Sequence, residues 1–220
     1  MREQPNTGAK VLEKIPYGEK LVTVAGDTNP PAIITEGFTG SWWKVNYNNK
    51  TGYIVSCYVL PVPPPKTGTK TLSDYFGQLS SVNGSPVVIK KSNPELNEMG
   101  ESTLTKQLYK NGMEWQKAEG YESGSEIYML PDLTIEQCFL LLRLTGQYPD
   151  IISDKEAFPS KNSTVKIEAG EKTIEVEREK YDGKNGPVKK IKIIVTQGAY
   201  TEFEMFMVDT QVVILWSSGV

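Results

Sequence analysis

Two adjacent tryptophans, followed by a tight turn and a Gly-Tyr strand, constrain the fold of this chain more than any other feature. After Trp42 and Trp43, residues 44–47 alternate polar and apolar side chains with the period of two that a half-buried strand requires. Asn48-Asn49 is a turn signal, because asparagine tolerates the left-handed conformation of a tight hairpin. Residues 50–54 then start a second strand. The segment therefore predicts a short β-hairpin.

Another strand is predicted on the N-terminal side of this hairpin. Residues 21–24 form an apolar, β-branched run, and residues 26–31 contain the Gly, Asp, Asn and Pro that are typical of a loop. Short strands joined by turns at this spacing indicate a small barrel, not a parallel sheet.

The motifs between Arg2 and Leu60 resemble the bacterial SH3-like (SH3b) domain. In that family an Arg and a Pro near the first turn precede an apolar pair, a Gly-x-x-apolar strand, Trp-x-Lys-Val, and Gly-Tyr or Gly-Trp. The matching residues here are Arg2 and Pro5, Val11-Leu12, Gly18 to Leu21, Trp42 to Val45, and Gly52-Tyr53. The family's domain begins with a strand before the Arg, so we expect either Met1 or another segment to supply that edge. The resemblance implies an all-β recognition module.

The eukaryotic SH3 domain is the alternative, because Trp42-Trp43 and residues 52–59 also resemble its tryptophan pair and last strand. Eukaryotic SH3 domains bind polyproline helices with stacked aromatic side chains and a proline in that last strand. Val55 stands where that proline would be, and the tyrosine-rich opening strand and acidic loop are missing. These departures favour the bacterial type.

The aromatic side chains of the predicted barrel are the candidate ligand-binding residues. Neighbours on a strand face opposite ways, so we expect one tryptophan of the pair to be buried and the other to be more exposed. An aromatic side chain on a small barrel fills core volume as often as it stacks on a ligand, and core packing is the alternative for each. A groove suited to a peptide or glycan is expected to contain Tyr17, Trp42, Trp43, Tyr53 and Tyr58.

Length and charge set limits on the rest of the chain. A chain of 220 residues needs a second domain beyond one barrel. The net charge of -3 and the pI near 5.3 give no electrostatic case for nucleic acid or an anionic membrane as partner. No apolar run approaches the roughly 20 residues of a membrane span, since the run at 138–142 ends at Arg143.

A proline-rich stretch at residues 61–69 marks the boundary between the predicted domains. Such a run favours an extended, semi-rigid spacer, and a polyproline ligand for another domain is the alternative. The predicted organisation is a bacterial SH3-like barrel over residues 1–60, a linker over 61–70, and a second domain over 71–220.

Helices and strands are both predicted in the second domain. The apolar spacing at 72–79 predicts a helix with Thr71 as its cap, and 135–145 predicts an apolar helix with a capping box from Thr134 to Gln137 and a stop at Gly146. Before the second helix, the sequence predicts a buried strand at 87–89, a hairpin turn at Asn111-Gly112 and a strand at 127–130.

The last third of the chain predicts an antiparallel meander of about five strands. Their expected ranges are 164–168, 173–177, 190–196, 202–207 and 212–216, with a loop at 182–186. Apolar and charged residues alternate cleanly in 173–177, so one face of the sheet is expected to meet water. With its helices, the second domain is predicted to be α+β. The fold class is therefore multi-domain, an N-terminal all-β SH3-like barrel plus a C-terminal α+β domain that resembles no family we recognise.

Catalytic chemistry has little support in the sequence. The chain contains no histidine, which excludes His-activated nucleophiles, His proton relays and His-ligated zinc. Papain-like endopeptidases, which often accompany SH3b domains, need a Cys beside a His. Cys57, in the last barrel strand, and Cys138, in an apolar helix, are predicted to be free buried thiols. Acidic residues at 168–179 are spaced like a solvated strand face, and no cofactor or metal site is predicted.

The resemblance implies a role in the cell envelope. Bacterial SH3-like domains occur mostly in secreted, periplasmic or lipid-anchored proteins, and no signal peptide follows Met1, so we expect an export signal upstream of this sequence. The predicted function is a non-catalytic binding protein that recognises peptidoglycan peptide or glycan, or a protein partner. The alternatives are a scaffold whose barrel packs on the second domain, and a hydrolase with convergent carboxylates in a C-terminal pocket.

Overall fold

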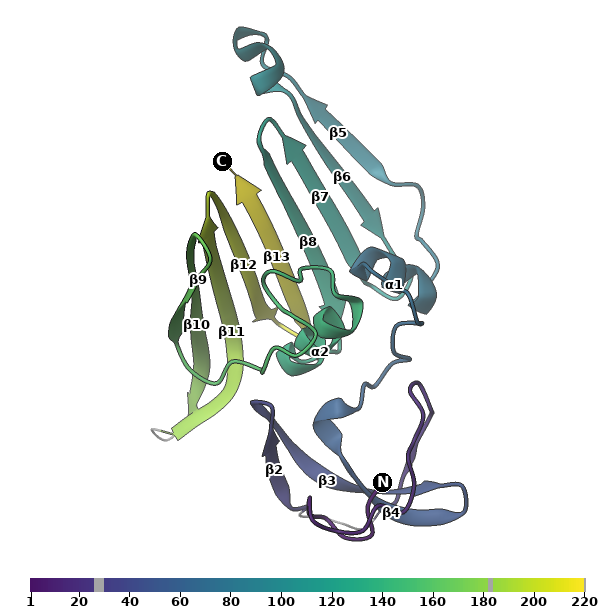
Figure 1. Ribbon diagram of the computed structural model, residues 1–220. Coiled ribbons are helices and arrows are strands. Elements are labelled where there is room, and N and C mark those ends of the chain that lie inside the picture. The colour runs from purple at the N-terminus through teal and green to yellow at the C-terminus, as the bar shows by residue number, and fades with distance from the viewer. Residues whose placement is uncertain (26–29, 182–183, 220) are drawn as a thin grey trace.

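The computed structural model describes residues 1–25, 30–181 and 184–219, and it consists mostly of antiparallel strands. A small N-terminal sheet lies below a large C-terminal sheet, and two helices lie between the two sheets (Figure 1). Two predicted loops, at 26–31 and at 182–186, lie partly outside the described residues.

The N-terminal sheet is organised around one long strand. Strand β3 (Phe38–Tyr47) pairs with β1 (Val22–Thr23), β2 (Ala32–Thr35) and β4 (Lys50–Val55), all antiparallel. Asn48 and Asn49, with φ of 49° and 57°, form the left-handed turn between β3 and β4, as the sequence predicts. A short 3₁₀ helix, η1 (Ser56–Tyr58), follows β4.

The first residues of the chain supply the expected edge. Arg2 forms antiparallel bridges to Tyr53 of β4 and to Val11. The backbone N–H of Arg2 donates to the Tyr53 carbonyl, and that of Tyr53 donates to the Arg2 carbonyl, both at 2.8 Å. Residues 1–2 thus extend the sheet beyond β4.

The C-terminal sheet has nine strands in the order β5-β6-β7-β8-β13-β12-β11-β10-β9. Two meanders meet where β8 pairs with β13. The first meander contains β5 (Val87–Lys91), β6 (Ser102–Leu108), β7 (Glu114–Gly120) and β8 (Ser123–Pro131), with a 3₁₀ helix η2 (Pro94–Gly100) between β5 and β6. The second contains β9 (Ser163–Ile167), β10 (Gly170–Tyr181), β11 (Lys184–Gln197), β12 (Ala199–Val208) and β13 (Gln211–Gly219).

Both predicted helices are confirmed with their caps. Helix α1 (Leu72–Leu79) begins where the Thr71 side chain accepts the N–H of Asp74. Helix α2 (Ile135–Thr145) has the full capping box between Thr134 and Gln137 and ends at Gly146 in the left-handed conformation, with φ of 64°. These local signals need no tertiary context, because a cap satisfies backbone groups of its own helix.

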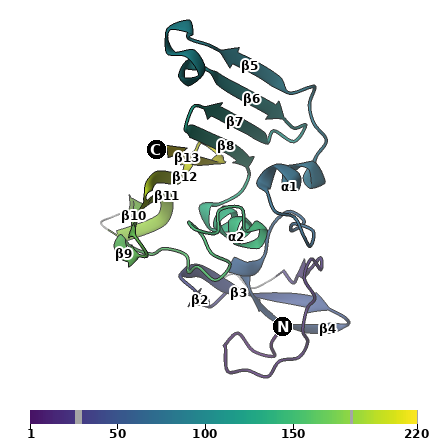
Figure 2. The same cartoon turned by 45° about the horizontal axis from the view of Figure 1, so that its top comes forward.

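The main core lies between the C-terminal sheet and the two helices (Figure 2). Helix α2 is buried around most of its circumference and contributes Phe139, Leu141 and Leu142. The sheet contributes alternate residues of its central strands, including Tyr128, Leu130, Ile191, Ile193, Phe203, Met205, Val212 and Ile214. This helix-on-sheet packing explains the apolar circumference of α2.

The opposite face of the second meander carries paired charges, as the predicted alternation requires. Lys192 and Lys190 bind Glu202 and Glu204, respectively, across β11 and β12, with Nζ–O distances of 2.8 and 2.7 Å. In β10 the exposed Glu175 and Glu177 flank the half-buried Val176. That face therefore meets water.

Three local predictions are wrong. The 87–89 segment is a strand, but its side chains are exposed because β5 is an edge strand. Cys57 lies in η1, not in a strand. The predicted loop at 182–186 is the third, because β11 begins at Lys184. The predicted antiparallel meander of five strands is confirmed as β9 to β13, which form one side of the nine-stranded sheet.

The division into separate domains stays a prediction. Phe38 of β3 belongs to the same buried cluster as Phe139 of α2, so one core continues across the predicted boundary. Among the described residues, no helix combines the length and the apolar character needed to cross a bilayer.

Candidate functional site

The two tryptophans of β3 lie on opposite faces of the strand. Trp42 pairs with Val55 and Trp43 pairs with Ile54 of β4. Trp42 is 4% exposed and Trp43 is 39% exposed, which confirms that one of the pair is buried. Trp42 is thus a core residue of the N-terminal sheet, and Trp43 is the tryptophan that a ligand can reach.

Tyr53 is half-buried on β4, opposite Lys44 of β3. Adjacent residues of a strand face opposite ways, so Tyr53 does not share the face that Ile54 and Trp43 occupy. Its backbone groups are bonded to Arg2. Tyr53 therefore contributes structurally to the sheet edge.

Tyr17 lies in the loop before β1, next to Gly18, whose φ is +82°. Its side chain is 58% exposed, yet its hydroxyl donates to the carbonyl oxygen of Pro65 at 2.8 Å. Partial burial raises the pKa of the Tyr17 phenol. Tyr17 thus contacts the proline-rich segment of its own chain.

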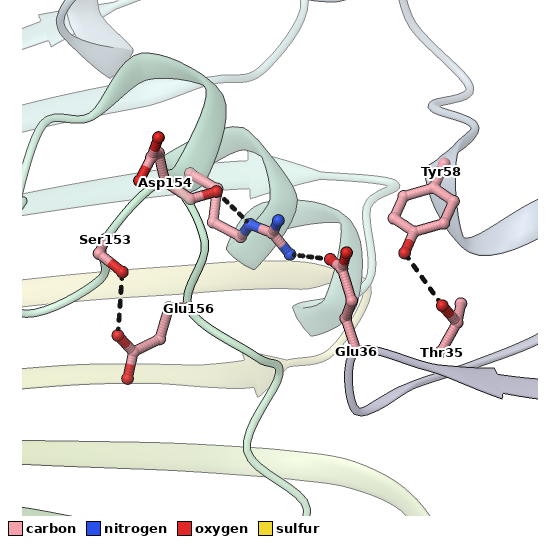
Figure 3. A network of polar contacts seen from close by, with 7 residues as sticks. Thr35, Glu36, Tyr58, Ser153, Asp154 and Glu156 are labelled. Carbon is pink, nitrogen blue, oxygen red and sulfur yellow. Dashed lines mark hydrogen bonds and ion pairs between the residues drawn. The ribbon is translucent and has the colours of Figure 1, made fainter.

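Tyr58 lies at the junction between the two sheets. Its hydroxyl is hydrogen-bonded to the Thr35 hydroxyl at 3.2 Å, as Figure 3 shows, and its ring meets Phe38 edge-on with centroids 6.3 Å apart. Burial raises the pKa of the Tyr58 phenol. The side chain is 44% exposed, so it is reachable from solvent near this junction.

The candidate aromatic residues do not form one groove. Within the described ranges, no ring contact links any two of them, and none lines the hollow at the β3–β4 turn or the larger hollow beside β10 and β11. One hollow, of about 380 Å³, lies at the β3–β4 turn and is lined by Asn46, Tyr47, Asn48, Asn49 and Thr51. Trp43 therefore presents an exposed aromatic surface on the strand that leads into this polar turn.

The turn between β2 and β3 is bonded directly to the C-terminal part of the chain. Arg143 of α2 binds Glu36 through Nη1 at 2.8 Å and donates from Nε to the Asp154 carbonyl at 3.0 Å (Figure 3). The Phe158 N–H donates to the Glu36 carbonyl at 2.8 Å. The backbone of this turn is thereby fixed to the C-terminal part of the chain.

Aromatic rings extend this junction into the core. Phe38 stacks on Phe158 with centroids 5.1 Å apart, and it meets Phe139 edge-on at 5.9 Å. The Arg143 guanidinium lies 5.8 Å from the centroid of the Phe38 ring. Sequence reasoning missed this junction, and the only available signal was Glu36-Gly37 between two apolar runs, which is typical of any hairpin turn.

Neither cysteine of the chain is an activated nucleophile. Burial raises the pKa of both the Cys57 and the Cys138 thiols, so both are poorer nucleophiles than an exposed cysteine. The described ranges contain no group of three or more His, Cys, Asp or Glu side chains placed to hold a metal ion.

In the larger hollow, basic side chains outnumber the two carboxylates. It lies beside β10 and β11 with a volume of about 880 Å³, and its charged side chains are Lys161, Glu177, Arg178, Glu179, Lys180 and Lys189. Glu177 is paired with Lys189 at 2.7 Å. The predominance of basic side chains does not favour the acid-base pair that a carboxylate hydrolase requires.

One solved structure resembles this chain at low similarity. It is the crystal structure of the extracellular domain of PknH from Mycobacterium tuberculosis, with 14% sequence identity, covering 71% of this chain and 82% of that chain at a TM-score of 0.24. A TM-score this low does not establish a common fold. A search of curated proteins finds no match.

The family comparison concerns the N-terminal sheet. Residues 1–59 match the family model of the bacterial SH3 domain, which includes β1 to β4, the paired tryptophans and the Arg2 edge. The matched range agrees with the resemblance read from the motifs between Arg2 and Leu60. Residues 1–59 of this chain are therefore a bacterial SH3 domain.

Proposed function

We propose that this chain is a non-catalytic binding protein of the bacterial cell envelope, whose SH3 domain recognises a peptide in peptidoglycan or in a partner protein. The observation that carries this proposal is the exposed Trp43 on the central strand of a bacterial SH3 domain. An exposed tryptophan offers a large, rigid contact area, and such side chains dominate the energetics of many interfaces.

A binding role agrees with the chemistry of the side chains. The sequence contains no histidine, and both thiols have raised pKa values. Modules that bind without catalysis need only an accessible surface of suitable shape, which Trp43 and the neighbouring β3–β4 turn offer. Tyr17 and Tyr58 are proposed as secondary contacts, whereas Trp42 and Tyr53 act indirectly by supporting the strands.

A pull-down with purified cell wall tests the proposal. We expect the parent protein to be retained and Trp43→Ala to be retained at least about tenfold less, because a hot-spot tryptophan contributes about 2 kcal/mol or more. The matched control is Tyr121→Ala, which removes an aromatic side chain of similar exposure from the β7–β8 turn. Circular dichroism confirms that each variant is folded.

Two results count against the proposal. Absence of retention by the folded parent rejects cell wall as the ligand, and retention of Trp43→Ala equal to that of the parent rejects Trp43 as the contact. Wall material from which the stem peptides have been removed separates peptide recognition from glycan recognition. Fractionation of cells that express the full-length gene product tests the envelope location.

A scaffold role is the second candidate, and the Phe38 junction favours it. The SH3 domain shares a buried cluster with α2 and contributes the Glu36–Arg143 ion pair. In this case the domain serves mainly to brace the C-terminal sheet. The pull-down then shows no Trp43-dependent retention, whereas disruption of the junction destabilises the whole chain.

A further inference from the structure

The proline-rich segment between the SH3 domain and α1 is held from both sides by tyrosine hydroxyls. Tyr17 of the SH3 domain donates to the Pro65 carbonyl at 2.8 Å, and Tyr75 of α1 donates to the Pro63 carbonyl at 2.6 Å. Pro65 and Tyr75 are buried. In both Figures 1 and 2 a purple N-terminal loop rises beside the chain that leads to α1. Residues 61–65 are thus in contact with both parts of the molecule.

Further contacts fix the two ends of this segment. The Pro64 ring lies 3.8 Å from the position that a Cβ atom on Gly18 would occupy, so the Tyr17 loop lies next to the prolines. Val62 packs against the main core. Beyond Pro65, the N–H of Lys66 donates to the Gln78 side chain at 3.0 Å. A freely moving spacer would not make this set of contacts.

The chemistry of proline explains why tyrosine hydroxyls are the bonding groups. Proline has no backbone N–H, so the carbonyl oxygens are the hydrogen-bonding groups that its backbone offers. An extended proline-rich strand leaves those carbonyls without internal partners. Hydroxyl donors that face the strand satisfy them. Tyrosine hydroxyls are protonated donors at neutral pH, and burial raises the pKa of both the Tyr17 and the Tyr75 phenols further.

We infer that residues 61–65 are an intramolecular ligand of the SH3 domain, clamped between Tyr17 and Tyr75, and that an external ligand using the Tyr17 hydroxyl must displace them. The clamp rests on the contacts alone, whereas the competition with an external ligand rests on the proposed function. Trp43 is accessible while the clamp is closed. The Tyr17 hydroxyl becomes free to bond a ligand when the segment leaves it.

Proteolysis tests the clamp without any ligand. Lys66 is exposed and adjoins the clamped prolines, so trypsin cleavage after Lys66, followed by mass spectrometry, reports release of the segment. We expect Tyr17→Phe and Tyr75→Phe each to be cleaved about fivefold faster than the parent, because each loses one hydrogen bond of ordinary strength. Both substitutions keep the ring, and cleavage is measured below the unfolding transition.

The matched control is Tyr109→Phe. Tyr109 is a buried tyrosine whose hydroxyl donates to the Ser73 carbonyl of α1 at 3.4 Å, and its hydroxyl has no bond to residues 61–65 in the structure. We expect it to be cleaved at the parental rate. Equal cleavage rates in the parent, Tyr17→Phe and Tyr75→Phe would overturn the clamp.

Cell-wall retention then tests the competition. Tyr75→Phe leaves the SH3 surface unchanged, so we expect its retention to rise up to about fivefold if the wall ligand uses the Tyr17 hydroxyl. If the parent binds cell wall and Tyr75→Phe is cleaved faster but retained equally, the competition is overturned. Faster cleavage with no retention by any protein rejects the proposed function and supports the clamp.

Discussion

Removal of the Phe38 ring tests whether the SH3 domain and the C-terminal sheet share one core. Phe38 is fully buried and has ring contacts with Tyr58, Phe139 and Phe158 at centroid distances of 6.3, 5.9 and 5.1 Å. Two of these partners come from the C-terminal part of the chain. Phe38→Ala therefore leaves a cavity at the boundary between the two parts.

The expected loss of stability follows from this environment. Truncation of a buried phenylalanine to alanine costs about 3–5 kcal/mol in free energy of unfolding. Three ring partners and the Arg143 guanidinium place Phe38 in the middle or upper part of that range, at about 4 kcal/mol. For a chain of this length, about 1 kcal/mol shifts Tm by about 2–4 °C, so we expect Tm to fall by about 8–16 °C.

Calorimetry and urea titration measure this effect. The control is Ile34→Ala on β2, where the side chain is 76% exposed, and its effect should stay within about 0.5 kcal/mol. In the parent, tryptophan fluorescence and far-ultraviolet circular dichroism should report one coincident transition. A Tm shift of less than about 3 °C for Phe38→Ala, or a separate transition of the SH3 domain in the parent, would refute the shared core.

Three other expectations concern local strain, acid sensitivity and thiol reactivity. Gly37→Ala would place its Cβ 2.0 Å from the Phe158 oxygen at φ +80°, whereas Gly68→Ala has φ +91° and open space around its Cβ. In urea titration, Gly37→Ala should therefore destabilise the chain more than Gly68→Ala does. Equal losses of stability would show that backbone strain, and not the clash with Phe158, sets the cost. Hydrogen bonds from Lys192 and Tyr200 lower the pKa of Glu202, so its stabilising contribution is present above the unfolded pKa of about 4.3 and is lost as pH falls through the lower folded value. The parent should therefore lose more stability between about pH 5 and pH 3 than Glu202→Gln does, and parallel urea midpoints would contradict this. Cys138 is fully buried and Cys57 is half-buried, and burial raises the pKa of both thiols. A thiol reagent at pH 8 should therefore label Cys57 slowly and Cys138 only on unfolding. Rapid labelling of both cysteines in the native protein would contradict the structure.

Features set by neighbouring residues could be predicted from the sequence. The caps of α1 and α2, the Asn48-Asn49 turn and the Asn111-Gly112 hairpin all depend on groups within a few residues of each other. The bacterial SH3 domain could be recognised because its motifs are spread over the whole of residues 1–59. For Trp42 and Trp43, alternation along a strand predicts one buried side chain, but it does not decide which.

Features set by distant residues could not be predicted. The Glu36–Arg143 ion pair joins residues 107 positions apart, and a hairpin turn carries no record of such a partner. The run at 87–89 is apolar without periodicity, so it fits an exposed edge strand as well as a buried one. The clamp on Pro63 and Pro65 depends on where α1 lies relative to the Tyr17 loop, which the proline composition alone does not specify.

The central position of β13 determines when the nine-stranded sheet can form during synthesis. β13 pairs with β8, so the two meanders meet within the sheet at residues 211–219 (Figure 1). A nascent chain that has not reached residue 211 leaves the β8 edge without this partner, and an unpaired strand edge attracts other strands. The nine-stranded sheet therefore cannot be completed before residues 211–219 have been synthesised. Before that point, a chaperone that covers the open β8 edge would prevent wrong strand pairing.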